Sequence, residues 1–153
     1  DNAEKTFVYD KASRLILEID FKGISLIKQY DALGRITKET KARYSTDEAT
    51  TSYYYDLNSN LTNIKDANNK IVSYEYDNLN RKTKHTFASG AYQEFSYDKN
   101  SNLTSIKDAN NKTVSYEYDN LNRKTKHTYA GGAYQVSRPS VQTENPHKKS
   151  LKI

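Results

Sequence analysis

The dipeptide Tyr-Asp returns at a nearly constant spacing along this 153-residue chain. Successive intervals are 21, 25, 21, 21 and 21 residues, and the repeats start near Tyr9, Tyr30, Tyr55, Tyr76, Tyr97 and Tyr118. A 42-residue duplication lies on top of this period, because residues 56–93 match residues 98–135 at 33 of 38 positions. A fixed period of this length indicates an array of similar structural units.

Each unit has two positions suited to a left-handed backbone. One lies three residues after the Asp, at Ser13, Gly34, Ser59, Asn80, Ser101 and Asn122, and the other lies thirteen residues after it. Gly and Asn tolerate positive φ, and segments such as "DANN" and "ASGA" are typical of three-residue hairpin loops closed by a left-handed residue. We therefore predict structural turns at Gly23, Asn69, Gly90, Asn111 and Gly132, with Asp56, Asp77, Asp98 and Asp119 accepting backbone hydrogen bonds in the other turns.

Two turns per unit leave two strands of about six or seven residues each. The strand before each Tyr-Asp alternates cleanly, with Val72, Tyr74 and Tyr76 on one face. The strand after it does not, because "NLTSIKD" puts Leu103 and Ile106 on opposite faces, and the inner face of the sheet stays undetermined. The sequence predicts an all-β fold, an antiparallel meander of consecutive β-hairpins with about a dozen strands.

One unit is longer than the others. It runs from Asp31 to Tyr55 and has four extra residues, with the polar run "ARYSTDEATT" in place of a tight turn. A longer hairpin loop explains this economically, and a disrupted repeat is the alternative.

Composition narrows the possible classes of function. The hydrophobic fraction is only 35%, with 14 Tyr, and no Cys is present to form a disulfide or a thiolate metal site. The net charge is +5, but Arg138, Lys148, Lys149 and Lys152 near the C-terminus supply most of the excess. We expect no nucleic-acid partner, and no apolar run has the length of a membrane span. Because the first residue is Asp1, we expect a piece of a longer protein.

The segments "YDNLNRKT", "YDALGRIT" and "YDKNSNLT", followed by "DANN-K-VSYEYD", resemble the YD repeats of the Rhs family. That family includes Rhs-type bacterial polymorphic toxins, the C components of insecticidal toxin complexes, and animal teneurins. The resemblance covers about positions 7–135. It implies a strip of hairpins that spirals into a hollow β-shell, which encloses the C-terminal toxin domain in the bacterial members and belongs to an adhesion ectodomain in teneurins. The family's downstream core segment is absent, so no self-cleaving residue is assigned.

The resemblance also sets the expected organisation and partners. Residues 1–135 form the YD-repeat array, and residues 136–153 form a polar, non-repeating tail that we expect to be disordered or loosely attached. A truncated or frameshifted gene and a genuine short C-terminus both fit this tail. The implied function is a structural segment of a shell that encapsulates or presents a toxin domain, with the remaining repeats and that domain of the parent polypeptide as partners, secreted or at the cell surface.

Catalytic and metal-binding interpretations are weak. His85 and His127 occupy the same repeat position within "RKTKHT" and are expected to be ordinary strand residues, although paired catalysis remains a distant alternative. "DANNK" places oxygen ligands at alternate positions, as in a calcium-binding loop. Its fifth position is Lys70 or Lys112, however, and no glutamate follows at the required distance, which argues against a calcium site. The basic residue Lys84, with its neighbours, is expected to be neutralised across strands rather than to bind a polyanion. We predict no catalytic, metal or cofactor site.

Rows of aromatic rings are the remaining candidate site. Tyr74, Tyr76, Tyr116 and Tyr118 could stack against glycans, which gives the alternative function of a carbohydrate-binding or adhesion module. The same rings could instead hold neighbouring repeats together by cross-strand packing. Unpaired strands at both ends of the array lead us to expect self-association of the isolated chain.

Overall fold

The computed structural model describes residues 4–42 and 48–137. The strands in this part of the chain are β1 (Thr6–Tyr9), β2 (Leu15–Ile19), β3 (Ser25–Tyr30), β4 (Ile36–Ala42), β5 (Glu48–Tyr55), β6 (Leu61–Lys65), β7 (Ile71–Tyr76), β8 (Lys82–Thr86), β9 (Tyr92–Tyr97), β10 (Leu103–Lys107), β11 (Thr113–Tyr118), β12 (Lys124–Thr128) and β13 (Tyr134–Val136).

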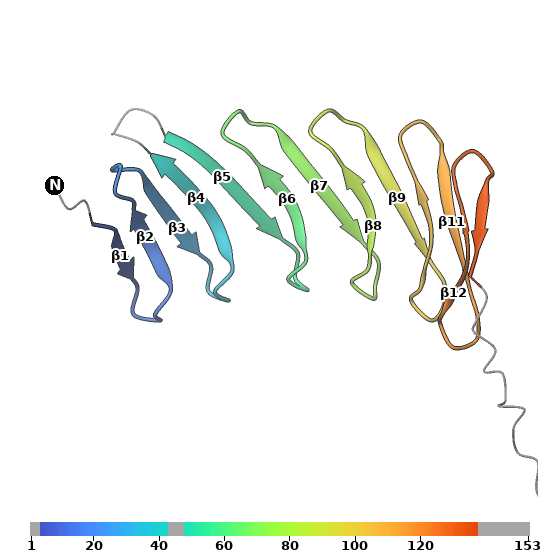
Figure 1. Ribbon diagram of the computed structural model, residues 1–153. Helices are drawn as coiled ribbons and strands as arrows, with labels where there is room; N and C mark the ends of the chain where they lie inside the picture. The colour runs from blue at the N-terminus through green and yellow to red at the C-terminus, as the bar shows by residue number, and fades with distance from the viewer. Residues whose placement is uncertain (1–3, 43–47, 138–153) are drawn as a thin grey trace, which may run out of the picture.

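All thirteen strands form one sheet in which every strand pairs antiparallel with the next in sequence (Figure 1). The predicted all-β meander of consecutive hairpins is therefore confirmed. Most strands have five or six residues, because the two turns of each repeat recur too closely to leave longer ones. Within the described residues no helix could cross a membrane.

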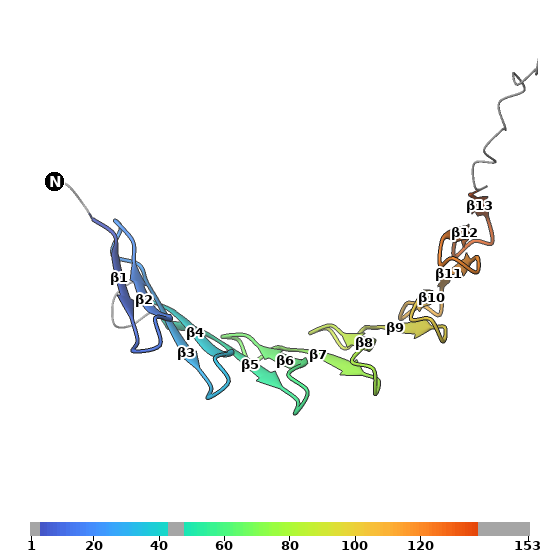
Figure 2. The ribbon, with the colours of Figure 1, turned by 90° about the horizontal axis from the view of Figure 1, so that it is seen from below.

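The sheet is a single curved layer. Seen from below, the strip bends into an arc, with β1 and β13 at its two ends (Figure 2). No second layer covers either face in the described part of the chain, and only Thr40 and Ala42, 8% and 9% exposed, are buried. Stability must therefore come from the backbone ladder and from contacts between neighbouring strands, as in other repeat proteins.

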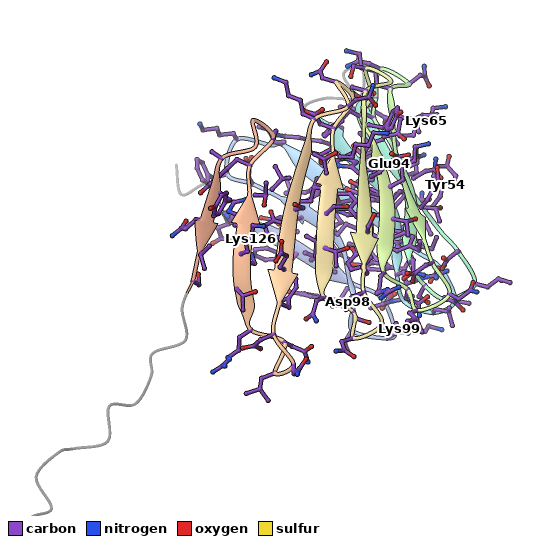
Figure 3. All side chains as sticks on the ribbon, turned by 90° about the vertical axis from the view of Figure 1, so that its right-hand side faces the viewer. Tyr54, Lys65, Glu94, Asp98, Lys99 and Lys126 are labelled. Atoms are coloured by element: carbon purple, nitrogen blue, oxygen red, sulfur yellow. The ribbon has the colours of Figure 1, made fainter. Side chains whose placement is uncertain are left out.

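The two faces of the sheet differ in chemistry. Residues paired across neighbouring strands share a face, which places Tyr74 with His85, and Phe95 with Ile106, on one side. We call this side the aromatic face. The other side carries Tyr54, Lys65 and Glu94, which Figure 3 shows projecting from the convex side of the arc. The aromatic face is therefore the concave one.

A β-bulge resolves the ambiguity of the strand that follows each Tyr-Asp turn. Leu103 pairs with Tyr97 and Ser105 with Ser96, so Thr104 is the extra residue. The bulge puts Leu103 and Ile106 on the same face, although simple alternation separates them. Equivalent register shifts occur in the other five repeats, and their extra residues are Ile16, Thr37, Thr62, Thr83 and Thr125.

The longer repeat remains a hairpin. β4 and β5 have seven and eight residues and pair without interruption from Lys38–Ser52 to Ala42–Glu48. The extra length therefore extends two strands as well as their connection, and residues 43–47 lie outside the described residues. The predicted tail begins at residue 136, but Val136 still belongs to β13, and residues 138–153 lie outside the described part of the chain.

Candidate functional site

The sheet has two rims made of turns. We call the rim that holds the turns starting at Asp10, Asp31, Asp56, Asp77, Asp98 and Asp119 the Tyr-Asp rim; it is the lower edge in Figure 1. The opposite rim holds the turns starting at Asp20, Asp66, Phe87, Asp108 and Tyr129, and the β4–β5 connection.

The same backbone geometry serves both rims. In each turn the fourth residue donates its N–H to the first residue's carbonyl, and the first donates to the fifth. The fourth residue has a φ between 58° and 86° throughout, which is the left-handed region. On the opposite rim these residues are Gly23, Asn69, Gly90, Asn111 and Gly132, and on the Tyr-Asp rim they are Ser13, Gly34, Ser59, Asn80, Ser101 and Asn122.

The aspartate of each Tyr-Asp turn is saturated with hydrogen bonds. Asp77 Oδ1 accepts the N–H groups of Leu79 (2.9 Å) and Arg81 (3.0 Å), and Asp77 Oδ2 accepts Arg81 Nε (2.7 Å). The side-chain bond from Arg81 is the largest of the causes that hold the pKa of Asp77 below its ordinary value, even though burial opposes it. Asp56, Asp98 and Asp119 cap their turns in the same way, with Asn60, Asn102 and Arg123 as partners.

The residue after the left-handed position also reaches the next turn along the rim. Arg81 Nη1 lies 3.0 Å from the carbonyl oxygen of Asp98 and 3.2 Å from Ser101 Oγ. Its guanidinium carbon lies 4.7 Å from the ring centroid of Tyr97, a cation–π contact. Tyr97 in turn donates its hydroxyl to the carbonyl oxygen of Lys82, at 2.8 Å. One arginine thus joins its own aspartate, the next tyrosine and the next turn.

The tyrosine bond of this junction recurs between every pair of consecutive Tyr-Asp repeats in the described residues. The repeat tyrosine donates its hydroxyl to a carbonyl of the preceding repeat at 2.8–3.0 Å each time: Tyr30 to Leu15, Tyr55 to Ile36, Tyr76 to Leu61, Tyr97 to Lys82 and Tyr118 to Leu103. Burial raises the pKa of Tyr76, Tyr97 and Tyr118, as expected for partly desolvated hydroxyls. The Tyr of the repeat therefore ties one hairpin to the next.

The tyrosine bond replaces missing backbone pairing. Between β8 and β9 the ladder covers only Lys84–Thr86 with Tyr92–Glu94, close to the opposite rim. The rest of β9, Phe95–Tyr97, pairs with β10 alone. The Tyr97 hydroxyl reaches the Lys82 carbonyl where that ladder has ended, so a side chain satisfies a backbone acceptor.

Two kinds of junction alternate along the C-terminal half of the rim. Arg35 and Arg81 reach turns with Ser at the left-handed position, Ser59 and Ser101. Asn60 and Asn102 are too short to reach the next backbone, and their Nδ2 atoms donate instead to Asn80 Oδ1 and Asn122 Oδ1, at 2.8 Å each. We call these Arg-to-Ser and Asn-to-Asn junctions. The 42-residue duplication spans one junction of each kind.

A small residue at the receiving position leaves room for the arginine. A Cβ added at Gly34 would lie 3.7 Å from Arg14 Nη1, which donates to the Asp31 carbonyl beside it. A longer side chain there would extend into the space that the guanidinium occupies. At the described junctions, an arginine in one turn therefore faces a turn with Gly or Ser at the left-handed position, and an asparagine faces a turn with Asn there.

The tyrosines predicted as ligand-stacking residues are engaged within the sheet. Tyr76 and Tyr118 donate their hydroxyls across junctions. Tyr74 stacks on His85 with centroids 4.9 Å apart, and Tyr116 lies at the same distance from His127. Burial first, and then the charge of Lys82, lowers the pKa of His85. Glycan stacking on these rings stays a prediction.

The other groups weighed for chemistry serve the fold. Asp66 Oδ1 caps its turn by accepting the N–H groups of Asn68 and Lys70 at 2.9 and 2.8 Å. Lys84 lies 3.5 Å from Glu75, a cross-strand ion pair on the convex face. No cluster of three or more His, Cys, Asp or Glu suited to a metal occurs among residues 4–42 and 48–137.

Sequence reasoning missed the residues that link the turns. Arg81 and Asn102 follow the left-handed position, and neither stood out as a site residue, because their partners in the next turn lie 17 to 20 residues away. The available signal was the alternation of "SN" and "NR" at this place in successive repeats.

The model of the Rhs repeat family matches residues 55–92 and 97–134, which contain these turns. The chain belongs to the Rhs repeat family.

Solved structures share the fold of this Rhs repeat chain. The crystal structure of TcdB2-TccC3-Cdc42 aligns with a TM-score of 0.71 and 18% sequence identity, over 82% of this chain and 7% of the other. TcdB2-TccC3 without its hypervariable C-terminal region aligns with a TM-score of 0.70 and 20% identity, with the same coverage. A Tc holotoxin pore from Photorhabdus luminescens, carrying a mutated TccC3, gives 0.69 and 19%, again over 82% and 7%.

These likenesses establish the fold. The chain spans only 7% of the length of each structure that it matches. A search of curated proteins finds no significant match.

Proposed function

We propose that this Rhs repeat chain forms part of the wall of a β-shell that encapsulates or presents a toxin domain of a larger secreted or surface protein. The observation that carries the proposal is the curved, single-layer sheet with its repeated Tyr-Asp junctions (Figure 2). A wall needs a sheet that grows by repetition and bends in one direction, and both properties follow from similar hairpins joined by a recurring tyrosine bond. The similar solved structures are Tc toxin assemblies.

The concave aromatic face supports the same proposal. A single layer leaves this face half-buried, with rings such as Tyr74 and Phe95 lining the inside of the arc. The convex face carries cross-strand ion pairs, such as Lys126 with Glu117 at 2.8 Å and Lys107 with Glu94 at 3.6 Å. Near the N-terminus two ion pairs lie on the concave face instead, Lys28 with Glu39 and Lys5 with Glu18, each at 3.6 Å. In the C-terminal part of the arc, a charged outer side and an aromatic inner side suit the separation of solvent from enclosed polypeptide.

The gene surrounding this chain provides the first test. The DNA on both sides, read in all frames beyond codon 135, should resume the Tyr-Asp spacing and continue into a different terminal domain. Repeats that end for good, with no further domain in any frame, would overturn the encapsulation proposal.

Protease protection of the complete gene product provides the second test. A terminal domain inside a shell should survive a protease that digests the same domain expressed alone, and mild denaturant should remove this protection. Equal digestion rates for the enclosed and free domains would overturn the proposal.

A further inference from the structure

We propose that the convex face over β4, β5 and β6 holds a carboxylate site, in which Lys38 and Lys65 bind an acidic side chain of a protein partner above Ser52. The site lies on the outer face of the arc, so it goes beyond the proposed shell and does not depend on an enclosed toxin domain. Two equivalent rows of side chains on the convex face, one earlier and one later in the chain, indicate it.

The later row crosses from β7 to β10 and alternates in charge. Glu75 pairs in register with Lys84, and Lys84 with Glu94. Glu94 pairs in turn with Lys107. Lys84 Nζ lies 3.5 Å from Glu75 Oε1, and Lys107 Nζ lies 3.6 Å from Glu94 Oε2. Each lysine of this row therefore has its own glutamate, and the row is neutral.

The earlier row crosses from β3 to β6 and keeps both lysines without either acid. Gln29 pairs with Lys38, and Ser52 lies between Lys38 and Lys65. Counted from the Tyr-Asp pairs, Gln29 and Ser52 occupy the positions of the two glutamates of the later row. Both lysines are half-buried, and in the described part of the chain neither forms an ion pair. A carboxylate from outside would balance their charge.

The acidic side chains nearest to this row do not fill the place above Ser52. Asp66 follows Lys65 in sequence, but its carboxylate accepts N–H groups of its own turn, as that of Asp108 does in the later copy. Glu48 is on the same strand as Ser52, but it lies four residues earlier, roughly 14 Å along the strand. The place between the lysines therefore stays open to a ligand.

An exposed aromatic ring lies beside the same lysines. Tyr54 and Ile71 are 50% and 49% exposed, and together with Asn63 and Lys65 they line a hollow of about 350 Å³ on the convex side (Figure 3). Smaller polar residues occupy the equivalent positions of the later copy: Ser96, Ser105 and Thr113. The exposed ring and the unpaired lysines thus occur together, in the earlier copy.

The later row shows which group fits between the lysines. There the group is the carboxylate of a glutamate side chain, Glu94, in contact with Lys107. A protein segment with an acidic side chain next to an apolar one matches the open place in the earlier row. Its carboxylate would accept hydrogen bonds from Lys38, Lys65 and Ser52 Oγ. Its apolar side chain would pack on Tyr54, because exposed aromatic rings are favoured in protein interfaces.

Fluorescence anisotropy with a labelled peptide tests this site on the complete chain. The probe is a short peptide of glutamate and glycine with one central leucine, and its control has glutamine in place of every glutamate. At low ionic strength the chain should bind the glutamate peptide saturably and about tenfold more tightly than the control.

The later copy supplies the variant that closes the site. Ser52→Glu places the side chain of Glu94 between the two lysines and should weaken binding of the glutamate peptide about tenfold. Ser52→Gln adds similar bulk without charge and should weaken it less than about threefold. Ser105→Glu adds the same charge to the convex face five strands away and should leave binding nearly unchanged.

The opposite substitution should open a second site in the later row. Glu94→Ser removes the ion pair of Lys107 and, introduced together with Ser52→Glu, should restore part of the lost binding. The restored site should be weaker than the natural one, because Ser96 replaces the ring of Tyr54 there. Circular dichroism spectra of all variants check that the sheet is intact.

Four results would overturn the inference. Three of them are equal binding of the glutamate and glutamine peptides, equal binding of the glutamate peptide by Ser52→Glu and the natural chain, and equal weakening by Ser105→Glu and Ser52→Glu. The fourth is tighter binding of a short oligothymidylate than of the glutamate peptide, which would assign the lysines to a nucleic-acid partner instead.

Discussion

The two rims of this sheet use the same turn but differ in what joins one turn to the next. On the Tyr-Asp rim, side chains connect each turn to its neighbour through arginine or asparagine, as Arg81 does with Asp98 and Ser101. On the opposite rim, aspartates cap their own turns, as Asp66 caps Asn68 and Lys70, and the side-chain link to a neighbouring hairpin is a single bond, from Ser25 Oγ to the Ala42 carbonyl at 3.3 Å, among the described residues. Backbone geometry alone therefore does not determine how firmly neighbouring hairpins are held.

The longer repeat differs from the other repeats at the opposite rim and not at the Tyr-Asp rim. The longer repeat extends β4, β5 and their connection toward the opposite rim, while its Tyr-Asp turn at Asp31 keeps the aspartate and arginine contacts of the Arg81 junction. The backbone ladder between repeats also lies close to the opposite rim, as between β8 and β9. The backbone thus holds neighbouring repeats at one rim and side chains hold them at the other.

The largest effect is expected from inserting residues into a turn. Four Gly/Ser residues inserted after Lys99, on the Tyr-Asp rim (Figure 3), would separate Asp98 from the N–H groups that it caps and would move Ser101 away from Arg81. We expect the melting temperature to fall by about 10 °C. The matched insertion after Ala109, in the turn at the other end of β10, also separates Asp108 from the N–H groups that it caps but breaks no side-chain link to a neighbouring turn. It should therefore lower the melting temperature by only about 3 °C.

Calorimetry or circular dichroism melting of the two insertion variants measures this difference. The comparison between the rims would be wrong if both insertions lowered the melting temperature equally, or if the Ala109 insertion were the more damaging.

Removal of a junction ring should have the next largest effect. Tyr97→Ala deletes the ring under Arg81 and the hydroxyl bond to Lys82, and should reduce the free energy of unfolding by about 2 kcal/mol. Tyr54→Ala is the control, because Tyr54 is 50% exposed on the convex face, and its loss should be below about 1 kcal/mol. Urea unfolding curves of both variants test this, and equal losses would show that junction tyrosines are not special.

Lowering the pH should gradually reduce the free energy of unfolding that the Tyr-Asp rim contributes, and by less than Tyr97→Ala does. The folded-state pKa of Asp77 is depressed below 3.8, chiefly by the Arg81 side chain, so its stabilisation is fully present above that pH and is lost as pH falls through the folded pKa. Asp77→Asn should be less stable than the natural chain at pH 7 and should lose less stability between pH 5 and pH 2.

Asp20 on the opposite rim provides the comparison for this acid effect. Its pKa is also lowered, first by the backbone bond from Ile24, but no arginine contributes. Asp20→Asn should therefore flatten the pH dependence less than Asp77→Asn. Urea midpoints measured across this pH range test the prediction, and parallel curves for Asp77→Asn and the natural chain would contradict it.

Local chemistry made the turns predictable from the sequence. A left-handed residue such as Asn111 and a capping aspartate such as Asp98 act within five residues of chain, so each repeat carries its own complete signal. The order of strands followed as well, because short loops between strands join only neighbours.

The concave face and the junctions needed coordinates. Simple alternation of side chains between the two faces puts Leu103 and Ile106 on opposite faces, whereas the structure puts them on the same face. The bulge at Thr104 adds one residue without a partner, and a pattern of period two does not reveal such an insertion. The partner of Arg81 could not be identified from the sequence, because the 21-residue period places an equivalent turn in every repeat. Only the register of neighbouring hairpins shows that the next turn, rather than a later one, receives it.

The energy of one junction can be measured directly at Arg81 and Ser101. A double-mutant cycle uses Arg81→Asn, Ser101→Asn and the double variant, which recreates the Asn-to-Asn pair seen at Asn60 and Asn80. If side chains join the repeats at this rim, the double variant should be about 1 kcal/mol more stable than the two single losses predict. Losses that add within about 0.3 kcal/mol would show that neighbouring turns do not interact.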